Sequence, residues 1–139
     1  MNKKYLFLPM ETLAREFDYK LVLAAMCVDK DIDVYLGQHD YIFRLSHFLK
    51  GGVYLGKNLM RRLQNGDWTS ERHLAIKKNG FTVIHLDEEG GVHYGGRDDW
   101  IYRIQNRIDL SNIDSEDLIF TWGKFQADTY TEATQLTNN

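Results

Sequence analysis

The chain has 139 residues, of which 43% are hydrophobic, 13% aromatic and 27% charged, and its formal net charge is −3. This composition suits one globular domain and excludes a disordered chain, and the slight negative charge gives no sign of a nucleic-acid partner or an anionic membrane surface. The single cysteine, Cys27, lies in an apolar helical pattern, which predicts a buried thiol and excludes an intrachain disulfide or a cysteine-based metal site. No run reaches the roughly 18 apolar residues that span a bilayer. The first residues make a poor signal peptide, so we expect a cytoplasmic protein.

Five short apolar runs predict strands, and they alternate with helical patterns along the chain. The runs are residues 5–8, 31–37, 53–56, 81–86 and 118–122. Alternating strands and helices are typical of a parallel sheet with helices on both of its faces. The sequence therefore predicts one Rossmann-like α/β domain over residues 1–139. Its doubly wound, mainly parallel sheet has about five strands, and a polar tail ends the chain.

Helical spacing of apolar residues marks the segments between and after these runs. The segment from residue 12 to residue 28 predicts a helix that is buried on more than one side. Shorter helices are expected at residues 41–49, 59–63, 70–78, 99–108 and 124–134. Asn65 and Gly66 form a turn signal, but they lack the alternating flanks of a good hairpin signal.

Three adjacent carboxylates, Asp87, Glu88 and Glu89, follow the fourth predicted strand, and Gly90 and Gly91 allow a sharp turn after them. Ligands of open α/β sheets bind at the carboxyl ends of the strands. Because adjacent like charges repel, a stable fold is expected to supply cations, hydrogen bonds or a raised pKa here. A solvated acidic turn explains the stretch equally well when it is taken alone.

Polar residues at the other strand ends are expected to converge on the same edge of the sheet. Glu11 and Arg15 follow the first strand four residues apart. They form either a surface ion pair or a site in which Arg15 holds an anionic or hydroxylated ligand. Lys57 follows the third strand and is either solvated or positioned to bind phosphate or carboxylate. His85, inside the fourth strand, is expected to be a hydrogen-bonded core residue.

The sequence lacks the spacings that are typical of common metal, cofactor and nucleophile sites. The five histidines show no metal-ligand spacing. The patterns H-E-x-x-H, G-x-G-x-x-G, G-x-x-x-x-G-K and G-x-S-x-G are missing. We therefore expect no metal and no bound cofactor.

Four segments of the chain carry motifs that occur together in one known family. Residues 8–21 contain P-x-E at the end of a strand and then R-E-F-D-x-K-L at the start of a helix. The other three segments are G-x-Y-L-x-K at residues 52–57, L-D-E-E-G at 86–90 and F-x-W-G-x-x-Q at 120–126. In this order they resemble the bacterial surface carbohydrate (surface polysaccharide) biosynthesis proteins.

The resemblance implies a glycosyltransferase-like protein with two Rossmann-type domains that face a cleft, the GT-B arrangement. It covers only the N-terminal domain, which by analogy holds the acceptor. A nucleotide-sugar donor and a glycan acceptor are the implied partners, with peripheral contact to a surface-polysaccharide assembly complex. Because the second domain has no counterpart here, the isolated chain is expected to be incomplete for catalysis.

The same resemblance turns the acidic turn into a candidate catalytic site. Glycosyl transfer needs a base for the acceptor hydroxyl or a carboxylate nucleophile. The candidate catalytic residues are Glu88, as first choice, with Asp87 and Glu89. The residues expected to bind substrate are Glu11, Arg15, Lys57 and Gly90.

Three other interpretations stay open at this point. The first is a non-catalytic module that binds a glycan or a partner protein. The second is a Mg²⁺-dependent phosphoryl-transfer or receiver-like domain, since acidic clusters at strand ends also bind Mg²⁺; against it, no acidic pair ends the first strand. The third is a plain structural domain.

Overall fold

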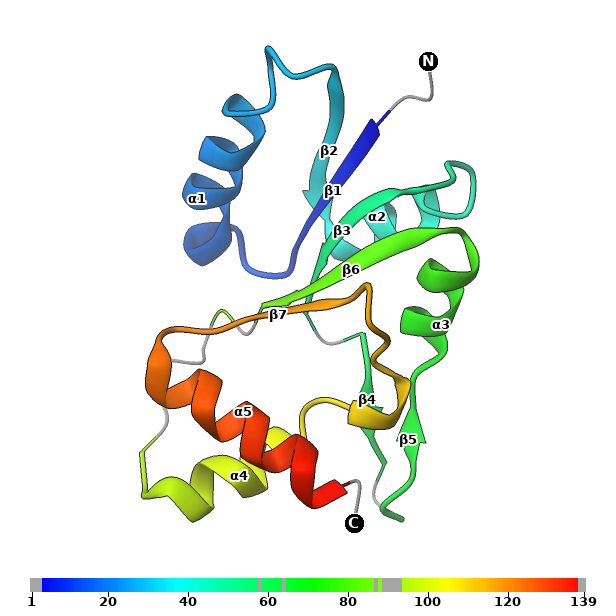
Figure 1. Cartoon of the computed structure of the whole chain (residues 1–139). Coiled ribbons are helices and arrows are strands. Elements are labelled where there is room, and N and C mark those ends of the chain that lie inside the picture. The colour runs from blue at the N-terminus through cyan, green and yellow to red at the C-terminus, as the bar shows by residue number, and fades with distance from the viewer. Residues whose placement is uncertain (1–3, 58, 64, 87, 89–93, 138–139) are drawn as a thin grey trace.

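A parallel sheet of five strands forms the centre of the molecule (Figure 1). The computed structural model describes residues 4–57, 59–63, 65–86, 88 and 94–137. The strand order is β2-β1-β3-β6-β7, and every pairing in this sheet is parallel. The strands are β1 (Lys4–Met10), β2 (Ile32–Gln38), β3 (Gly52–Gly56), β6 (Phe81–Leu86) and β7 (Leu118–Phe120). The predicted Rossmann-like α/β fold with a parallel sheet is confirmed.

Helices cover both faces of the sheet, as a doubly wound fold requires (Figure 1). One helix, α1, lies on one face against β1 and β2, while α2 and α3 lie on the other face. The last two helices, α4 and α5, pack on each other below β7 in the view of Figure 1. The bounds are α1 (Leu13–Ala25), α2 (His39–Leu45), α3 (Glu71–Lys78), α4 (Arg97–Gln105), α5 (Lys124–Thr137) and the 3₁₀ turn η1 (Leu110–Asn112). None of the helices in the described ranges is both long enough and apolar enough to span a bilayer.

Two apolar cores stabilise these layers. The first lies between the sheet and the pair α2 and α3, where Phe7, Tyr54 and Val83 meet Ile42 and Ile76. The second joins α4 to α5 and reaches β7. Its members are Ile101, Ile104, Tyr130 and Ala133, with Ile119 of β7 packed against them.

The segment predicted as a helix at residues 59–63 is not helical. It contains the short strand β4 (Arg61–Arg62), which pairs antiparallel with β5 (Trp68–Thr69). The turn between them has Gly66 at φ 90°, a value that glycine adopts without strain, and the Leu63 N–H donates to the Asp67 carbonyl. Backbone turn chemistry thus outweighed the weak helical spacing of this segment.

The prediction that the first helix is buried on more than one side is wrong. In α1 the charged residues Glu16 and Lys20 face inward and are 1% and 2% exposed, whereas Leu13 and Val22 are more than half exposed. Lys20 donates to the carbonyl of Pro9, a contact that fixes this rotation of the helix. Cys27, just after the helix, is half-buried rather than buried.

Candidate functional site

Glu88 lies two residues beyond the end of β6, at the carboxyl edge of the sheet. Its side chain is 6% exposed. Its Oε1 accepts a hydrogen bond from the Tyr19 hydroxyl and lies 2.8 Å from Lys20 Nζ. Its Oε2 lies 3.8 Å from Lys57 Nζ and has no hydrogen-bond partner within the described part of the chain. The cations that the acidic turn was expected to need are therefore present around Glu88.

A buried ion pair on α1, between Glu16 and Lys20, contacts the Glu88 carboxylate through the lysine. Lys20 Nζ lies 2.9 Å from Glu16 Oε2 as well as close to Glu88, so it bridges two carboxylates. Burial by itself would raise the pKa of Glu16, but hydrogen bonds from Lys20 and Arg15 outweigh it and lower this pKa to about 2. Burial and the bond to Glu88 raise the pKa of Tyr19, so its hydroxyl remains a donor at neutral pH.

The Glu16 carboxylate also caps the N-terminal end of α1. Its two carboxylate oxygens accept the backbone N–H groups of Glu11 and Thr12 at 3.0 and 3.2 Å. Those N–H groups precede the helix and have no partner within it, so the carboxylate replaces a conventional cap. The backbone that carries Glu11 into the site is fixed in this way.

The other predicted site residues in the described ranges lie around Glu88. Glu11 Oε2 lies 3.8 Å from Lys57 Nζ, so Lys57 contacts both Glu11 and Glu88. Arg15 pairs with Glu16 at 3.0 Å and lines the same pocket as Glu88. The structure thus brings Glu11, Arg15, Lys57 and Glu88 together, as expected from their positions after neighbouring strands.

The remaining predicted residues are Asp87, Glu89 and Gly90. They lie outside the described residues. Their assigned roles therefore stay predictions.

Glu88 opens onto a pocket of about 570 Å³ between α1 and the end of β7. This volume is within the usual range of small-molecule sites. The pocket is lined mainly by Arg15, Tyr19, Glu88, Phe120, Thr121 and Trp122. The backbone N–H of Trp122 donates to Gln126 Oε1 at 2.6 Å, and this bond fixes the turn that carries the indole. The pocket therefore combines a carboxylate acceptor and a cation with two exposed aromatic side chains.

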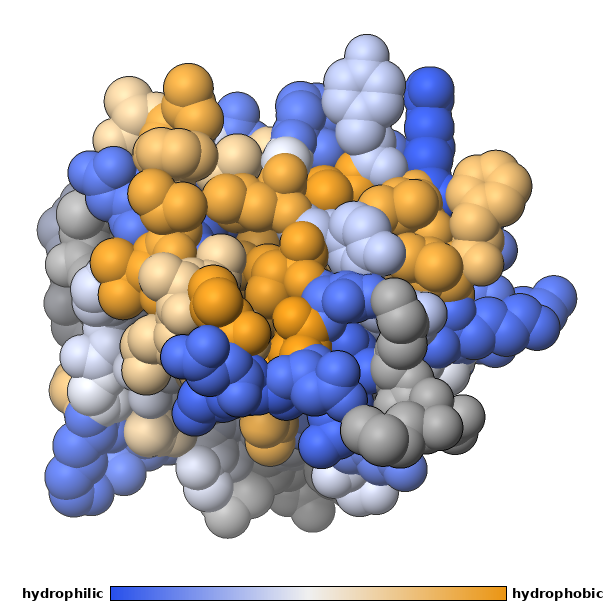
Figure 2. All heavy atoms as spheres, turned by 90° about the horizontal axis from the view of Figure 1, so that it is seen from above, coloured by the Kyte–Doolittle hydropathy of each residue, from blue (hydrophilic) through white to orange (hydrophobic). Residues whose placement is uncertain are grey.

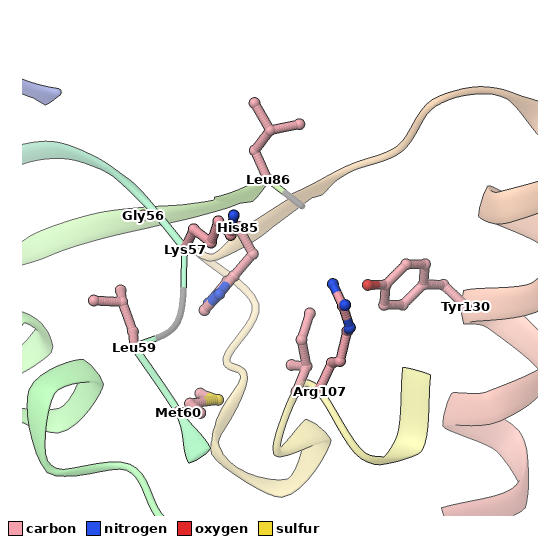
Figure 3. A pocket seen from close by; sticks show the side chains of 9 residues that line it. Gly56, Lys57, Leu59, Met60, His85, Leu86, Arg107 and Tyr130 are labelled. Atoms are coloured by element: carbon pink, nitrogen blue, oxygen red, sulfur yellow. The ribbon is translucent and has the colours of Figure 1, made fainter. Parts of the chain in front are cut away.

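A second, smaller pocket of about 40 Å³ is lined by Lys57 and shares Leu86 with the first (Figure 3). Lys57 and His85 enter it from the ends of β3 and β6, and Figure 3 shows the Tyr130 hydroxyl directed toward the Arg107 guanidinium. Among the described residues its lining contains cationic and hydroxyl donors but no carboxylate. A space of this size with such donors suits water or a small oxyanion.

A buried polar cluster lies beside this pocket. His73 of α3, His85 of β6 and Asp117, just before β7, place potential metal-ligand atoms within 4.8 Å of one another. Asp117, however, accepts the Val83 N–H at 3.1 Å and lies 2.9 Å from Lys77 Nζ, so its charge is already balanced. Because the Lys77 ammonium disfavours a second cation, we assign the cluster a structural role that joins α3 to β6 and to the start of β7.

Sequence reasoning missed Tyr19 and Lys20, which contact Glu88 most closely. Both were read as part of a helix whose apolar face was expected to turn inward. One signal was available, because Glu16 and Lys20 are four residues apart and can pair across one helical turn. The histidine cluster was missed because its members come from three separate elements.

The candidate site is therefore a charged carboxyl edge of the sheet, with Glu88 at its centre and an aromatic wall beside it. Comparisons with protein-family models, with curated proteins and with solved structures found no match for this chain. The assignment of a function thus depends on the geometry of the site.

Proposed function

We propose that this chain is the acceptor-side domain of a glycosyltransferase-like protein of bacterial surface polysaccharide biosynthesis. The observation that carries the proposal is the environment of Glu88. Tyr19 and Lys20 hold one of its oxygens, the other is buried without a hydrogen-bond partner among the described residues, and the residue lines a ligand-sized pocket. A carboxylate oxygen of this kind is a strong acceptor for a sugar hydroxyl.

The rest of the pocket supports a carbohydrate ligand. Phe120 and Trp122 are 49% and 61% exposed and offer flat apolar surfaces, which pack well against the C–H face of a sugar ring. Arg15 lines the same pocket and can donate to ring or carboxylate oxygens. In this proposal Glu88 orients the acceptor hydroxyl and takes up its proton, or attacks the sugar itself in a double displacement.

Lys57 has a separate role in the proposal. It contacts Glu11 and Glu88 and also lines the small pocket, which Arg107 and Tyr130 supply with further hydrogen-bond donors. A phosphate or carboxylate group of the nucleotide-sugar donor would meet positive charge there. The sugar-nucleotide portion of the donor would be held by a second domain.

Replacement of Glu88 tests the proposal directly. Glu88→Gln keeps the shape and removes the charge, so we expect glycan binding by the full chain to weaken at least about tenfold, the loss typical of a charge-assisted hydrogen bond. Transfer from a nucleotide sugar, assayed with whatever second domain completes the protein, should be abolished. Titration calorimetry and a product assay measure the two effects.

Two further variants accompany this experiment, one as a control and one as a second test of the pocket. Glu116→Gln removes an exposed carboxylate outside the pocket and should change neither binding nor transfer. Trp122→Ala shortens an exposed side chain of the pocket and should weaken binding without a change in the melting temperature. Wild-type affinity and turnover in the folded Glu88→Gln variant would contradict the proposal.

A non-catalytic glycan-binding domain is the second candidate. Glu88 is the one carboxylate among the described residues that line the large pocket, and ligand binding needs no second acidic group. Binding without turnover in the complete protein would favour this candidate. The Mg²⁺-dependent alternative is less well supported, because Lys20 and Lys57 occupy the positions around Glu88 that a divalent cation would take.

A further inference from the structure

An apolar groove of about 400 Å³ continues from the candidate site along the face of the sheet that carries α1. Its lining consists of Tyr19, Val22, Leu23, Leu55, Leu86 and Phe120. Tyr19, Leu86 and Phe120 also line the pocket that contains Glu88. The two hollows are therefore one continuous surface with a polar end and an apolar end.

The groove is open because of the way α1 is rotated. Glu16 and Lys20 occupy the inward side of the helix, and Val22 is left 59% exposed. Figure 2, which looks onto the upper end of the view in Figure 1, shows apolar side chains spread over much of this surface with hydrophilic ones along its margin. A surface helix normally presents the opposite arrangement.

The sheet face beside α1 also loses its cover toward β7. Leu55, Ile84 and Leu118 are in register across β3, β6 and β7, so their side chains form one row on one face. Along this row Leu55 is buried, Ile84 is half-buried and Leu118 is 48% exposed. The reason is that α5 packs on α4 instead of lying over these strands (Figure 1). Exposed apolar surface on this scale usually marks a binding site.

We propose that the groove binds the hydrocarbon chain of an amphiphilic ligand whose sugar head group lies in the Glu88 pocket. The inference rests on the proposed function and names its acceptor class: a glycan carried on a lipid chain. The continuity of the two hollows favours this occupant, because a single ligand of mixed polarity matches both ends at once. The groove volume exceeds ten times the roughly 30 Å³ that one water occupies in the liquid, which is room for several methylene groups.

The experiment titrates the full chain with methyl, butyl, hexyl and octyl glucosides and N-acetylglucosaminides, each below its critical micelle concentration. Burial of each methylene group should tighten binding by about fourfold until the groove is full. Methyl resonances of the groove residues should shift with the octyl compounds and not with the methyl compounds.

Two valine variants locate the effect. Val22→Asp places a charge in the groove and should reduce octyl-glycoside affinity to that of the methyl compound, which itself should bind as before. Val28→Asp is the matched control, because Val28 is 76% exposed near the same helix but lines a different hollow, beside β2. It should leave the dependence on chain length unchanged.

The remaining outcomes separate the two proposals. Affinity that is independent of chain length, but is lost in Glu88→Gln, would overturn the inference and leave the proposed function intact. Alkyl binding that is insensitive to Glu88→Gln would overturn the single-amphiphile inference together with the head-group role of Glu88. A dimer in solution that Val22→Asp dissociates and octyl glycosides do not would make a second copy the occupant, and would also overturn the inference.

Discussion

At the scale of single residues, the site is organised by one buried lysine. Lys20 Nζ contacts Glu16, Glu88 and the carbonyl of Pro9, so one ammonium connects α1, the end of β1 and the turn after β6. Buried ion pairs seldom add much net stability, because desolvation offsets their attraction. The value of this contact is that it fixes the position of Glu88.

Removal of this ammonium should be costly. Lys20→Met keeps a similar length but leaves Glu16 and Glu88 buried without their closest cation, and we expect a loss of about 3–5 kcal/mol in the free energy of unfolding. Urea denaturation measures the loss. The double variant Glu16→Gln, Lys20→Met should recover part of it. A loss below about 1 kcal/mol in the single variant would show that the cluster is solvated.

At the scale of the elements, the five strands of the parallel sheet could be predicted from the sequence, whereas the short strands β4 and β5 and the environment of the first helix could not. Strands of parallel sheets are rich in apolar residues, and all five could be recognised as short runs of such residues, although the run at 31–37 also contains Asp31 and Asp33. Helical spacing identifies which residues of α1 share a face, but it does not say what covers that face. The rotation of α1 about its axis depends on the contacts of Lys20 with Pro9 and Glu88. Pro9 lies in β1, before the helix, and Glu88 is remote in sequence.

The same distinction applies to the site. Glu11, Lys57 and Glu88 could be placed together because each follows a strand of one sheet, and strand ends converge. Tyr19 could not be identified, because its hydroxyl reaches Glu88 from the middle of a helix across 69 positions of sequence. Short motifs therefore located the edge of the sheet where the site lies, while packing supplied its closest contacts.

The start of β3 offers a test of local backbone geometry. Gly52 has φ +111°, and a Cβ added there would lie 2.9 Å from the Cβ of Tyr5 in β1. Gly52→Ala should therefore destabilise the fold by more than about 2 kcal/mol, from backbone strain and overpacking together. Thermal or urea unfolding provides the measurement.

Gly66 is the matched control for this substitution. It also has a positive φ, of +90°, but a Cβ there would meet nothing within 4 Å. Gly66→Ala should thus show the strain alone and cost about 1 kcal/mol. Equal losses in the two variants would mean that the contact with Tyr5 plays no part.

At the scale of the whole molecule, the candidate site is shared between the central sheet and the part of the fold that packs on α4 and α5. Leu86 belongs to the central sheet, and Ile119 of β7 packs against the core of α4 and α5, yet both line the large pocket. The structural cluster of His73, His85 and Asp117 joins α3 to β6 and to the start of β7. Its titration should therefore influence the stability of the whole fold.

The stability of the protein should fall in acid in two overlapping steps. Burial lowers the pKa of His85 from 6.5 to about 4, so the unfolded chain binds its proton first and stability is lost as the pH falls between these values. The pKa of Glu16 is lowered from 4.5 to about 2, so its contribution is lost between those values in the same direction. Each group acts with a slope of up to about 1.4 kcal/mol per pH unit.

Urea unfolding between pH 7 and pH 2.5 checks this profile. His85→Asn should weaken the upper step without removing it, because burial also lowers the pKa of the neighbouring His73, and should leave the lower step. Substitution of the exposed His47 by Asn should change neither step. An upper step of unchanged size in His85→Asn would assign it to another group.

Lys57 links Glu88 to the small pocket, since its ammonium contacts Glu11 and Glu88 and its side chain lines that pocket with Arg107. An anion that drew this ammonium into the small pocket would weaken its hold on Glu88. A sugar bound at Glu88 would, by thermodynamic reciprocity, change the affinity for that anion by the same factor. One flexible side chain would thus couple the binding of the anion to the binding of the sugar.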